Sequence, residues 1–466
     1  ISGDIDVDGT TNLDVVDIDG AVDMASTLQV DGAITFSSTL NGLDILADAT
    51  NFVDSILISQ NASTGTLDSA SSNTGLGDTV FSALTSGDFN TAVGFKALED
   101  HTTGASNTAI GAQALMNNTT AANNVAVGIS ALKTNTTGAS NVAIGKNALD
   151  ANTTAGNNTA VGADALGANT TGEFNIAIGS NAVDANTTAN YNIGIGYNAL
   201  TTEASGEKNV AIGHAALEDS NGGNFNTAVG YGSLRNSTTA DNNTAFGYHT
   251  LVTNTTGASN TAVGFGSLDA NTTGGFNVGL GQSALTDNTT GASNVAIGVS
   301  ALGTNSTADF NTAVGRDSLA ANTTGSSLVA VGKGALDANT TSSNSTAVGT
   351  DALGANTTGS DNTALGYAAL RDNTTASNNT AVGYFALEAN TTGDVNVGVG
   401  SLSLDANTTG SSNVAVGVHS LGNNTTADGN TAVGHSVMIA NTTGANNVAI
   451  GQLALDANTT ASNNVA

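Results

Sequence analysis

The sequence predicts an all-β fold: a parallel β-solenoid, or β-roll, of seventeen-residue coils behind a short β stalk. Three observations predict it. From Asn90 to Asn464 the unit Asn-(Thr/Val)-Ala-(Val/Ile)-Gly-x-x-Ala-Leu-x-x-Asn-Thr-Thr-(Gly/Ala)-x-x recurs without insertion or deletion. Counted from its Asn, position five is Gly in all 22 units and position nine is Leu in 20. No proline interrupts the chain, which suits a continuous backbone hydrogen-bond ladder.

Residues 1–72 form the predicted stalk. This segment contains 12 Asp and neither Lys nor Arg, and it alternates Asp with aliphatic residues, as in Val16-Asp17-Ile18-Asp19. Such alternation is typical of half-buried strands, and Asp-Gly pairs between the runs favour tight turns. We therefore expect short β-strands joined by turns.

Residues 73–89 are a degenerate copy of the unit. The stretch Asn73-Thr74-Gly75-Leu76-Gly77 keeps the Asn and the position-five glycine, but Val80 and Phe81 replace the Ala-Leu pair. Terminal coils of solenoids are usually atypical, because they cover the end of the stack. We expect this unit to be an N-terminal cap, and residues 90–466 to form twenty-two coils.

The invariant glycine at position five indicates a backbone requirement. Gly94, Gly111, Gly128 and Gly264 are examples. Glycine alone tolerates a positive φ freely, and it alone lacks the Cβ that would block a close approach of two chain segments. One of these two conditions is expected in every coil.

The apolar positions predict the core. Leu98, Leu115 and Leu268 stand at position nine, and position four is always Val, Ile, Leu or Phe, as in Val93. We expect both positions to face the interior. One coil alone buries too little to fold, so coils must stack, and the small apolar content of each coil favours several chains packed side by side as a homotrimer.

Position twelve is an Asn-Thr/Ser-Thr sequon in 18 units, including Asn118, Asn135 and Asn152. Two interpretations compete. The sequons could carry a row of N-linked glycans, or the asparagines could form a ladder at a turn, each side-chain amide bonding those of adjacent coils. We favour the ladder.

A disordered low-complexity tract is an alternative to the solenoid for the chain as a whole, but such a tract would not keep Gly and Leu at a fixed phase.

Two weaker motifs suggest ligands. Asp4, Asp6 and Asp8 match the first half of a calcium loop, although Val15 stands where that loop has its bidentate Glu. Solvent-facing Asp on a strand is the simpler explanation. Calcium is the one cofactor that the sequence suggests. The stacked threonines at positions thirteen and fourteen could form an ice-binding hydroxyl array, or could simply be β-branched residues suited to a sheet.

Composition excludes several functions. The formal net charge is −30, which disfavours nucleic acid and anionic membranes as partners. The sequence contains no cysteine and no apolar run long enough to cross a membrane, so we expect no membrane insertion. Five histidines occur, at spacings that do not suit metal ligands: His101, His214, His249, His419 and His435. The sequence also contains no nucleophile elbow and no phosphate loop, so we expect no enzyme.

The repeated segment Asn90-Thr91-Ala92-Val93-Gly94 resembles the head repeats of trimeric autotransporter adhesins, and the whole unit with its Ala-Leu and Asn-Thr-Thr-Gly is similar to repeats of bacteriophage tail fibres. The opening Asp-Gly-Thr-Thr-Asn-Leu segment resembles tail-fibre shafts of marine phages. The resemblance implies a parallel, fibrous homotrimer.

The expected function is a structural rod of a virion tail that spaces or mediates attachment to a host glycan or protein receptor and joins other tail or baseplate proteins. A bacterial or archaeal surface adhesin, or an extracellular filament subunit, is the alternative; an ice-binding protein is the third. Positions six, seven, ten, eleven and sixteen carry almost all the sequence variation, as at Lys146, Tyr197, Phe265 and Arg316. Any ligand surface is expected there.

Overall fold

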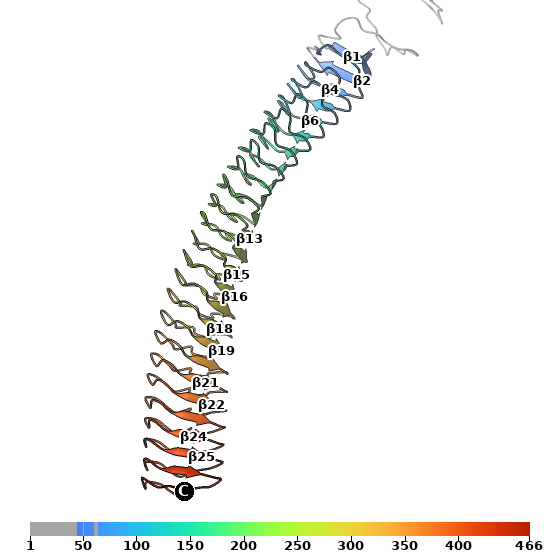
Figure 1. The fold of residues 1–466 in the computed structure, drawn as a ribbon. Helices are drawn as coiled ribbons and strands as arrows, with labels where there is room; N and C mark the ends of the chain where they lie inside the picture. Colours follow the sequence, from blue (N-terminus) through green and yellow to red (C-terminus); the bar gives the residue numbers. More distant parts are fainter. Residues whose placement is uncertain (1–43, 50, 60–63) are drawn as a thin grey trace, which may run out of the picture.

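The chain winds into a long curved rod. The computed structural model describes residues 44–49, 51–59 and 64–466. All regular elements of these residues are β-strands, and they form a parallel β-solenoid of about 23 coils with a repeat of about 17 residues. Figure 1 shows the coils stacked from β1 and β2 at one end to the C-terminus at the other. The predicted all-β fold, a parallel β-solenoid of seventeen-residue coils, is confirmed.

An antiparallel hairpin begins the described part of the rod. It consists of β1 (Asp44–Ala49) and β2 (Phe52–Ser59). β2 then pairs in parallel with β3 (Ala70–Ser71) and β4 (Thr74–Leu76). Parallel stacking therefore already includes part of residues 1–72, which the sequence assigns to the stalk. Residues 1–43, including the calcium candidates Asp4, Asp6 and Asp8, lie outside the described residues.

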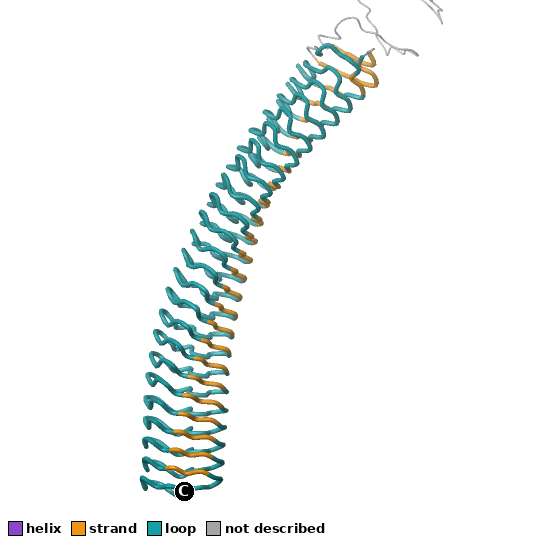
Figure 2. The backbone as a smooth tube through the Cα atoms, viewed as in Figure 1, coloured by secondary structure: helices purple, strands orange, loops and turns teal. Residues whose placement is uncertain are grey.

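From β4 onward each coil contributes one three-residue strand, and these strands line one side of the rod, while turns form the rest of each coil (Figure 2). Each strand pairs with the next in parallel, seventeen residues along. The remaining strands are β5 (Thr91–Val93), β6 (Thr108–Ile110), β7 (Val125–Val127), β8 (Val142–Ile144), β9 (Thr159–Val161), β10 (Ile176–Ile178), β11 (Ile193–Ile195), β12 (Val210–Ile212), β13 (Thr227–Val229), β14 (Thr244–Phe246), β15 (Thr261–Val263), β16 (Val278–Leu280), β17 (Val295–Ile297), β18 (Thr312–Val314), β19 (Val329–Val331), β20 (Thr346–Val348), β21 (Thr363–Leu365), β22 (Thr380–Val382), β23 (Val397–Val399), β24 (Val414–Val416), β25 (Thr431–Val433) and β26 (Val448–Ile450).

The interior of the rod is narrow. The middle residue of each strand, such as Ala92, points inward and is fully buried, and the Ala-Leu pair at positions eight and nine packs opposite it. Position four points outward: Ile110 is 41% exposed and Phe246 56%. The prediction that position four faces the interior is therefore wrong. Alternate residues of a strand face opposite sides, so a buried alanine at position three places positions two and four outside.

Backbone hydrogen bonds join neighbouring coils well beyond the strands. The Leu98 N–H donates to the Ala114 carbonyl at 3.1 Å, and the Thr102 N–H to the Thr119 carbonyl at 2.9 Å. Equivalent bonds recur along the rod. Each coil therefore satisfies much of its backbone by stacking, which fits a chain without proline.

Both predicted reasons for the position-five glycine are present. The φ angles are 130° at Gly94, 137° at Gly111, 140° at Gly128 and 121° at Gly264. A Cβ built on Gly94 would lie 2.6 Å from the carbonyl oxygen of Gly111 in the next coil. Any larger residue would therefore clash with backbone atoms of the next coil, which cannot move away by a change of side-chain rotamer.

The leucine at position nine combines burial with an unusual backbone. Leu98, Leu115 and Leu268 are fully buried, as the sequence predicts, but their φ angles are 51°, 49° and 53°. This left-handed conformation costs a residue with a Cβ about 1–2 kcal/mol. Full burial of a leucine contributes about 1.5–3 kcal/mol, which offsets that cost.

Leu268 provides a test of this balance. We expect Leu268→Ala to lower the free energy of unfolding by about 2–5 kcal/mol, because it opens a cavity and keeps the strained φ. Leu268→Gly should be no less stable than Leu268→Ala, since glycine releases the strain. Chemical denaturation of both variants measures the order. A glycine variant clearly less stable than the alanine variant would contradict the strained-turn account.

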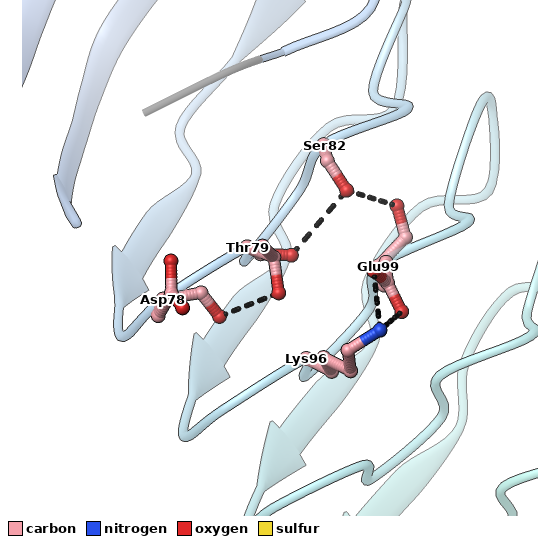
Figure 3. A network of polar contacts seen from close by, with 5 residues as sticks. All are labelled: Asp78, Thr79, Ser82, Lys96 and Glu99. Atoms are coloured by element: carbon pink, nitrogen blue, oxygen red, sulfur yellow. Dashed lines mark hydrogen bonds and ion pairs between the residues drawn. The ribbon is translucent and has the colours of Figure 1, made fainter. Parts of the chain in front are cut away.

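Side-chain contacts on the surface are sparse by comparison. Figure 3 shows one network in the first coils, where Lys96 and Glu99 form an ion pair at 3.0 Å and the Ser82 hydroxyl donates to the Glu99 carbonyl at 3.2 Å. In the same view the Thr79 hydroxyl donates to the Asp78 carbonyl at 2.8 Å. Ion pairs at a protein surface typically contribute only about 0–1 kcal/mol, so backbone stacking and the interior hold the rod together.

Candidate functional site

The most distinctive surface of the rod is the strand face, defined as the side chains at positions two and four of β4 to β26. Position two is always Thr, Val or Ile, and position four is always Val, Ile, Leu or Phe. These side chains are half-buried or exposed; Leu365, for example, is 48% exposed. No charged residue interrupts the strand face over these strands. The acidic side chains that give the chain its net charge of −30 therefore lie outside the strand face.

The strand face is large enough for a stable interface. Its strands repeat about every 4.8 Å, and a three-residue strand spans about 10 Å, so the face covers on the order of 1,000 Å². A stable protein interface buries about 800 Å² per partner. Position two is threonine in about half of these strands, but position four is apolar in all of them, and a continuous row of exposed apolar side chains marks an interaction site. The strand face is therefore the candidate assembly surface.

Two variable positions border the strand face. Position six lies just beyond the glycine turn, and position seventeen precedes the next asparagine. Exposed aromatic residues occupy both positions in several coils; Phe265 at position six is 57% exposed, and Phe276 at position seventeen is 68% exposed. These borders differ from coil to coil, whereas the strand face does not.

The position-twelve asparagines form the amide ladder that the sequence favours. Asn152 is fully buried; its Nδ2 donates to Asn135 Oδ1 at 2.8 Å and to the Ala155 carbonyl at 3.0 Å. Asn135 in turn donates to Asn118 Oδ1 at 3.2 Å. An oligosaccharide cannot be attached to these amides in the folded rod without breaking the ladder. The position-one asparagines form a second buried ladder, in which Asn107 Nδ2 donates to Asn90 Oδ1 at 3.1 Å.

The position-thirteen threonines use their hydroxyls within the rod. Thr102 Oγ1 donates to the Thr119 carbonyl at 2.9 Å, and Thr136 Oγ1 donates to the Thr153 carbonyl at 3.0 Å. These hydroxyl groups therefore donate their hydrogen bonds to the next coil rather than to a ligand. The array that the sequence offers for ice binding thus keeps only the exposed position-fourteen threonines, such as Thr103, for outside contacts.

His101 replaces asparagine in the position-twelve ladder and is fully buried. Asn118 Nδ2 lies 3.0 Å from His101 Nδ1, and His101 Nε2 lies 2.8 Å from the Gly104 carbonyl. Nδ1 must accept from the amide, so the proton is on Nε2 and the ring is neutral. Burial is the main cause that lowers the pKa of His101 below its ordinary value, and the Gly104 carbonyl, which accepts from Nε2, opposes that shift only in part.

This histidine predicts a local pH dependence. Below about pH 6.5 the unfolded chain binds a proton at His101 that the folded coil does not, so stability falls as the pH decreases towards the lowered folded pKa. We expect hydrogen-exchange protection of residues 90–121 to fall between pH 7.5 and pH 5, and to fall less in His101→Asn, which restores the ladder. Equal losses in both proteins would contradict the neutral-histidine assignment.

Half-buried carboxyl groups at position ten shift in the opposite sense. Burial is the main cause that raises their pKa above the ordinary range, so their contribution to stability decreases as the pH rises through the window just above that range. These carboxyl groups are present in both wild type and His101→Asn, so their pH-dependent contributions to stability cancel when the two proteins are compared. The six groups are Asp150, Asp184, Asp269, Asp337, Glu388 and Asp405.

Chemistry-bearing residues do not converge in the described part of the chain. No group of three or more His, Cys, Asp or Glu side chains there could hold a metal ion. Nor does any stretch of residues 44–49, 51–59 and 64–466 form a helix able to cross a membrane. The strand face thus remains the principal candidate site.

No protein-family model matches the chain. A search of curated proteins likewise finds no similar sequence. A role for the rod must therefore be inferred from its own surfaces, the strand face first.

Proposed function

We propose that this chain is the subunit of a fibrous rod in which three parallel copies pack side by side on their strand faces, and that the rod is part of a virion tail fibre or spike that spaces or mediates attachment to a host receptor. The observation that carries the proposal is the strand face, an uncharged surface with an apolar residue at position four of every coil from β4 to β26, on a strongly acidic chain.

Parallel packing in register follows from the repeat. Because coils recur at one constant spacing, two parallel copies can match coil for coil over the whole strand face. Acidic groups lie elsewhere, at variable positions such as ten and eleven, so packing on the strand face brings few charges together. Three copies, rather than two, are what the resemblance to trimeric adhesin heads and tail fibres implies.

The length of the rod also suits a structural role in a fibre. A rod of about 23 coils is about 110 Å long at a spacing of about 4.8 Å, which is a useful separation between a virion and a receptor-binding tip. Other tail or baseplate proteins and a host glycan or protein are its proposed partners. We propose neither a catalytic function nor a resident cofactor.

Gold-labelled antibodies against the rod test its location. Label on the tails of virus particles, together with antibody inhibition of adsorption to host cells, is the expected result. Label confined to cell surfaces or to filaments shed from cells would replace the tail fibre with an adhesin or filament subunit. Thermal hysteresis of the purified protein, without either label, would instead indicate ice binding.

A further inference from the structure

An aromatic ladder runs along position six of five consecutive coils, Tyr197, His214, Tyr231, Tyr248 and Phe265. Neighbouring ring centroids are 4.9–5.4 Å apart, and most planes are close to parallel. Tyr197, Tyr231 and Tyr248 are 46–51% exposed. The stacked rings fix one another, so the ladder is a rigid surface whose outer edges face solvent.

One ring at position seven adds to this surface, and the next coil leaves space beside the ladder. His249, at position seven, stacks on Tyr248 with centroids 4.1 Å apart, and lies 5.6 Å from Tyr231. One coil further along, position seven is Gly266, where an added Cβ would meet nothing within 4 Å. The side of Phe265 next to Gly266 is therefore open to a ligand.

The same part of the rod departs from the repeat inside. Three consecutive coils replace the position-twelve asparagine by Glu203, Ser220 and Ser237. Glu203 accepts hydrogen bonds from Ser220 Oγ at 2.7 Å and from the Gly222 N–H at 2.8 Å. At the two ends of this interruption, Asn186 Oδ1 and Ser237 Oγ have no hydrogen-bond partner within the described residues. Local departures from an otherwise consistent pattern are expected at functional sites.

The ladder is not suited to joining copies of the chain. An assembly contact that runs coil for coil needs the same surface in every coil, as the strand face has. Position six is instead Ser180 just before the ladder and Gln282 just after it, and it is charged at Lys146 and Arg316. The run of five aromatic residues is therefore a local surface, and a shorter one recurs at position six of two later coils, where Tyr367 and Tyr384 stack with centroids 5.6 Å apart. Local surfaces of this kind indicate a ligand rather than a contact that runs along the whole rod.

We propose that the position-six aromatic ladder binds a neutral glycan lying along the rod. Tyrosine offers rigid apolar area with a hydroxyl at its edge, at a low cost in conformational entropy, which matches the apolar faces and hydroxyl groups of a sugar. Two cations of this part of the rod already have partners, which disfavours an anionic glycan: Arg235 is paired with Glu218 at 2.7 Å, and Lys208 lies over the Phe225 ring. The chain charge of −30 also disfavours an anion.

The inference rests on the proposed function for its biological meaning, since it supplies a receptor class for an attachment fibre. Its test uses the purified full chain with four neutral probes, namely dextran, yeast mannan, cellohexaose and chitohexaose, and with heparin as the anionic probe. Calorimetry and affinity electrophoresis measure binding to wild type, to the ladder variant Tyr231→Ser/Tyr248→Ser, and to the matched control Phe276→Ser/Phe310→Ser, whose rings are exposed but outside the ladder.

We expect at least one neutral probe to bind, its affinity to fall about tenfold or more in the ladder variant, and the control to stay within about twofold of wild type. Heparin should not bind. Binding of none of the four neutral probes, or equal binding by the ladder variant, would overturn the inference. The native mass of each variant separates the two proposals: lost glycan binding with an intact assembly rejects only the ladder, whereas a monomeric wild type that binds glycan rejects only the assembly.

Discussion

Gly264→Val is expected to unfold the coils around it. A Cβ at Gly264 would lie 2.7 Å from the carbonyl oxygen of Gly281 and 2.8 Å from its carbonyl carbon, and the φ of 121° is itself unfavourable for valine. Backbone strain alone costs about 1–3 kcal/mol, and the clash adds to it because two stacked coils must separate. Hydrogen exchange should show lost protection in the coils on both sides of Gly264.

The matched control lies two residues away in the same coil. Gly266 also has a positive φ, 61°, but no atom lies within 4 Å of a Cβ built there. Asn147 and Asn198 adopt φ angles of 56° and 54° at the same position of other coils. Gly266→Asn should therefore change the unfolding free energy little. A valine at Gly264 as well tolerated as this asparagine would show that coils are not packed as closely as described.

Lysine substitutions on the strand face are expected to dissociate the proposed assembly into single chains. Ile212, Ile297 and Val382 stand at position four, five coils apart from one to the next, so their replacements do not meet within one chain. In a free chain each lysine can extend its charge into water. Between packed copies the ammonium groups would be buried without partners, which is costly. The variant Ile212→Lys/Ile297→Lys/Val382→Lys should therefore be a folded single chain.

The control for the strand face carries the same three charges on another side of the coil. Thr120, Thr290 and Thr375 are exposed at position fourteen. Their replacement by lysine should leave the number of chains unchanged. Circular dichroism of both variants verifies that the solenoid is intact. Dissociation by both variants alike would implicate net charge rather than the strand face.

Much of the fold could be predicted because stacking repeats one set of constraints in every coil. Gly264, Leu268 and Asn152 each recur at a fixed phase, and each meets its own copy in the next coil. A turn glycine, a core leucine and an amide ladder follow from that directly. Such constraints act along the rod, and a single sequence displays them about twenty times over.

The strand face could not be predicted by the same route. In the segment Thr-Ala-Ile at β6, residue size favours Ile110 for the interior, yet the coil is so thin that only Ala109 fits there. A shift of one residue in a strand exchanges its two faces, so a size argument alone misplaces the whole set. The absence of any charge at positions two and four was the signal that could have indicated a covered outer face.

The left-handed leucines were equally hidden. Nothing about Leu268 in the sequence indicates a φ of 53°, because leucine seldom adopts that region. The conformation is imposed by closing a seventeen-residue circuit around an alanine-lined interior. Closure is a property of the whole coil, so it cannot be inferred from the residue that carries the strain.

The native mass of the purified rod, measured by light scattering or native mass spectrometry over a range of concentrations, tests the central claim most directly. Assembly on the strand face predicts a particle of three chains, each of 45.4 kDa, that persists on dilution. Two chains would keep the covered face and correct the number of copies. A stable 45.4 kDa monomer at all concentrations would contradict the account, because the strand face would then be exposed to water along the whole rod.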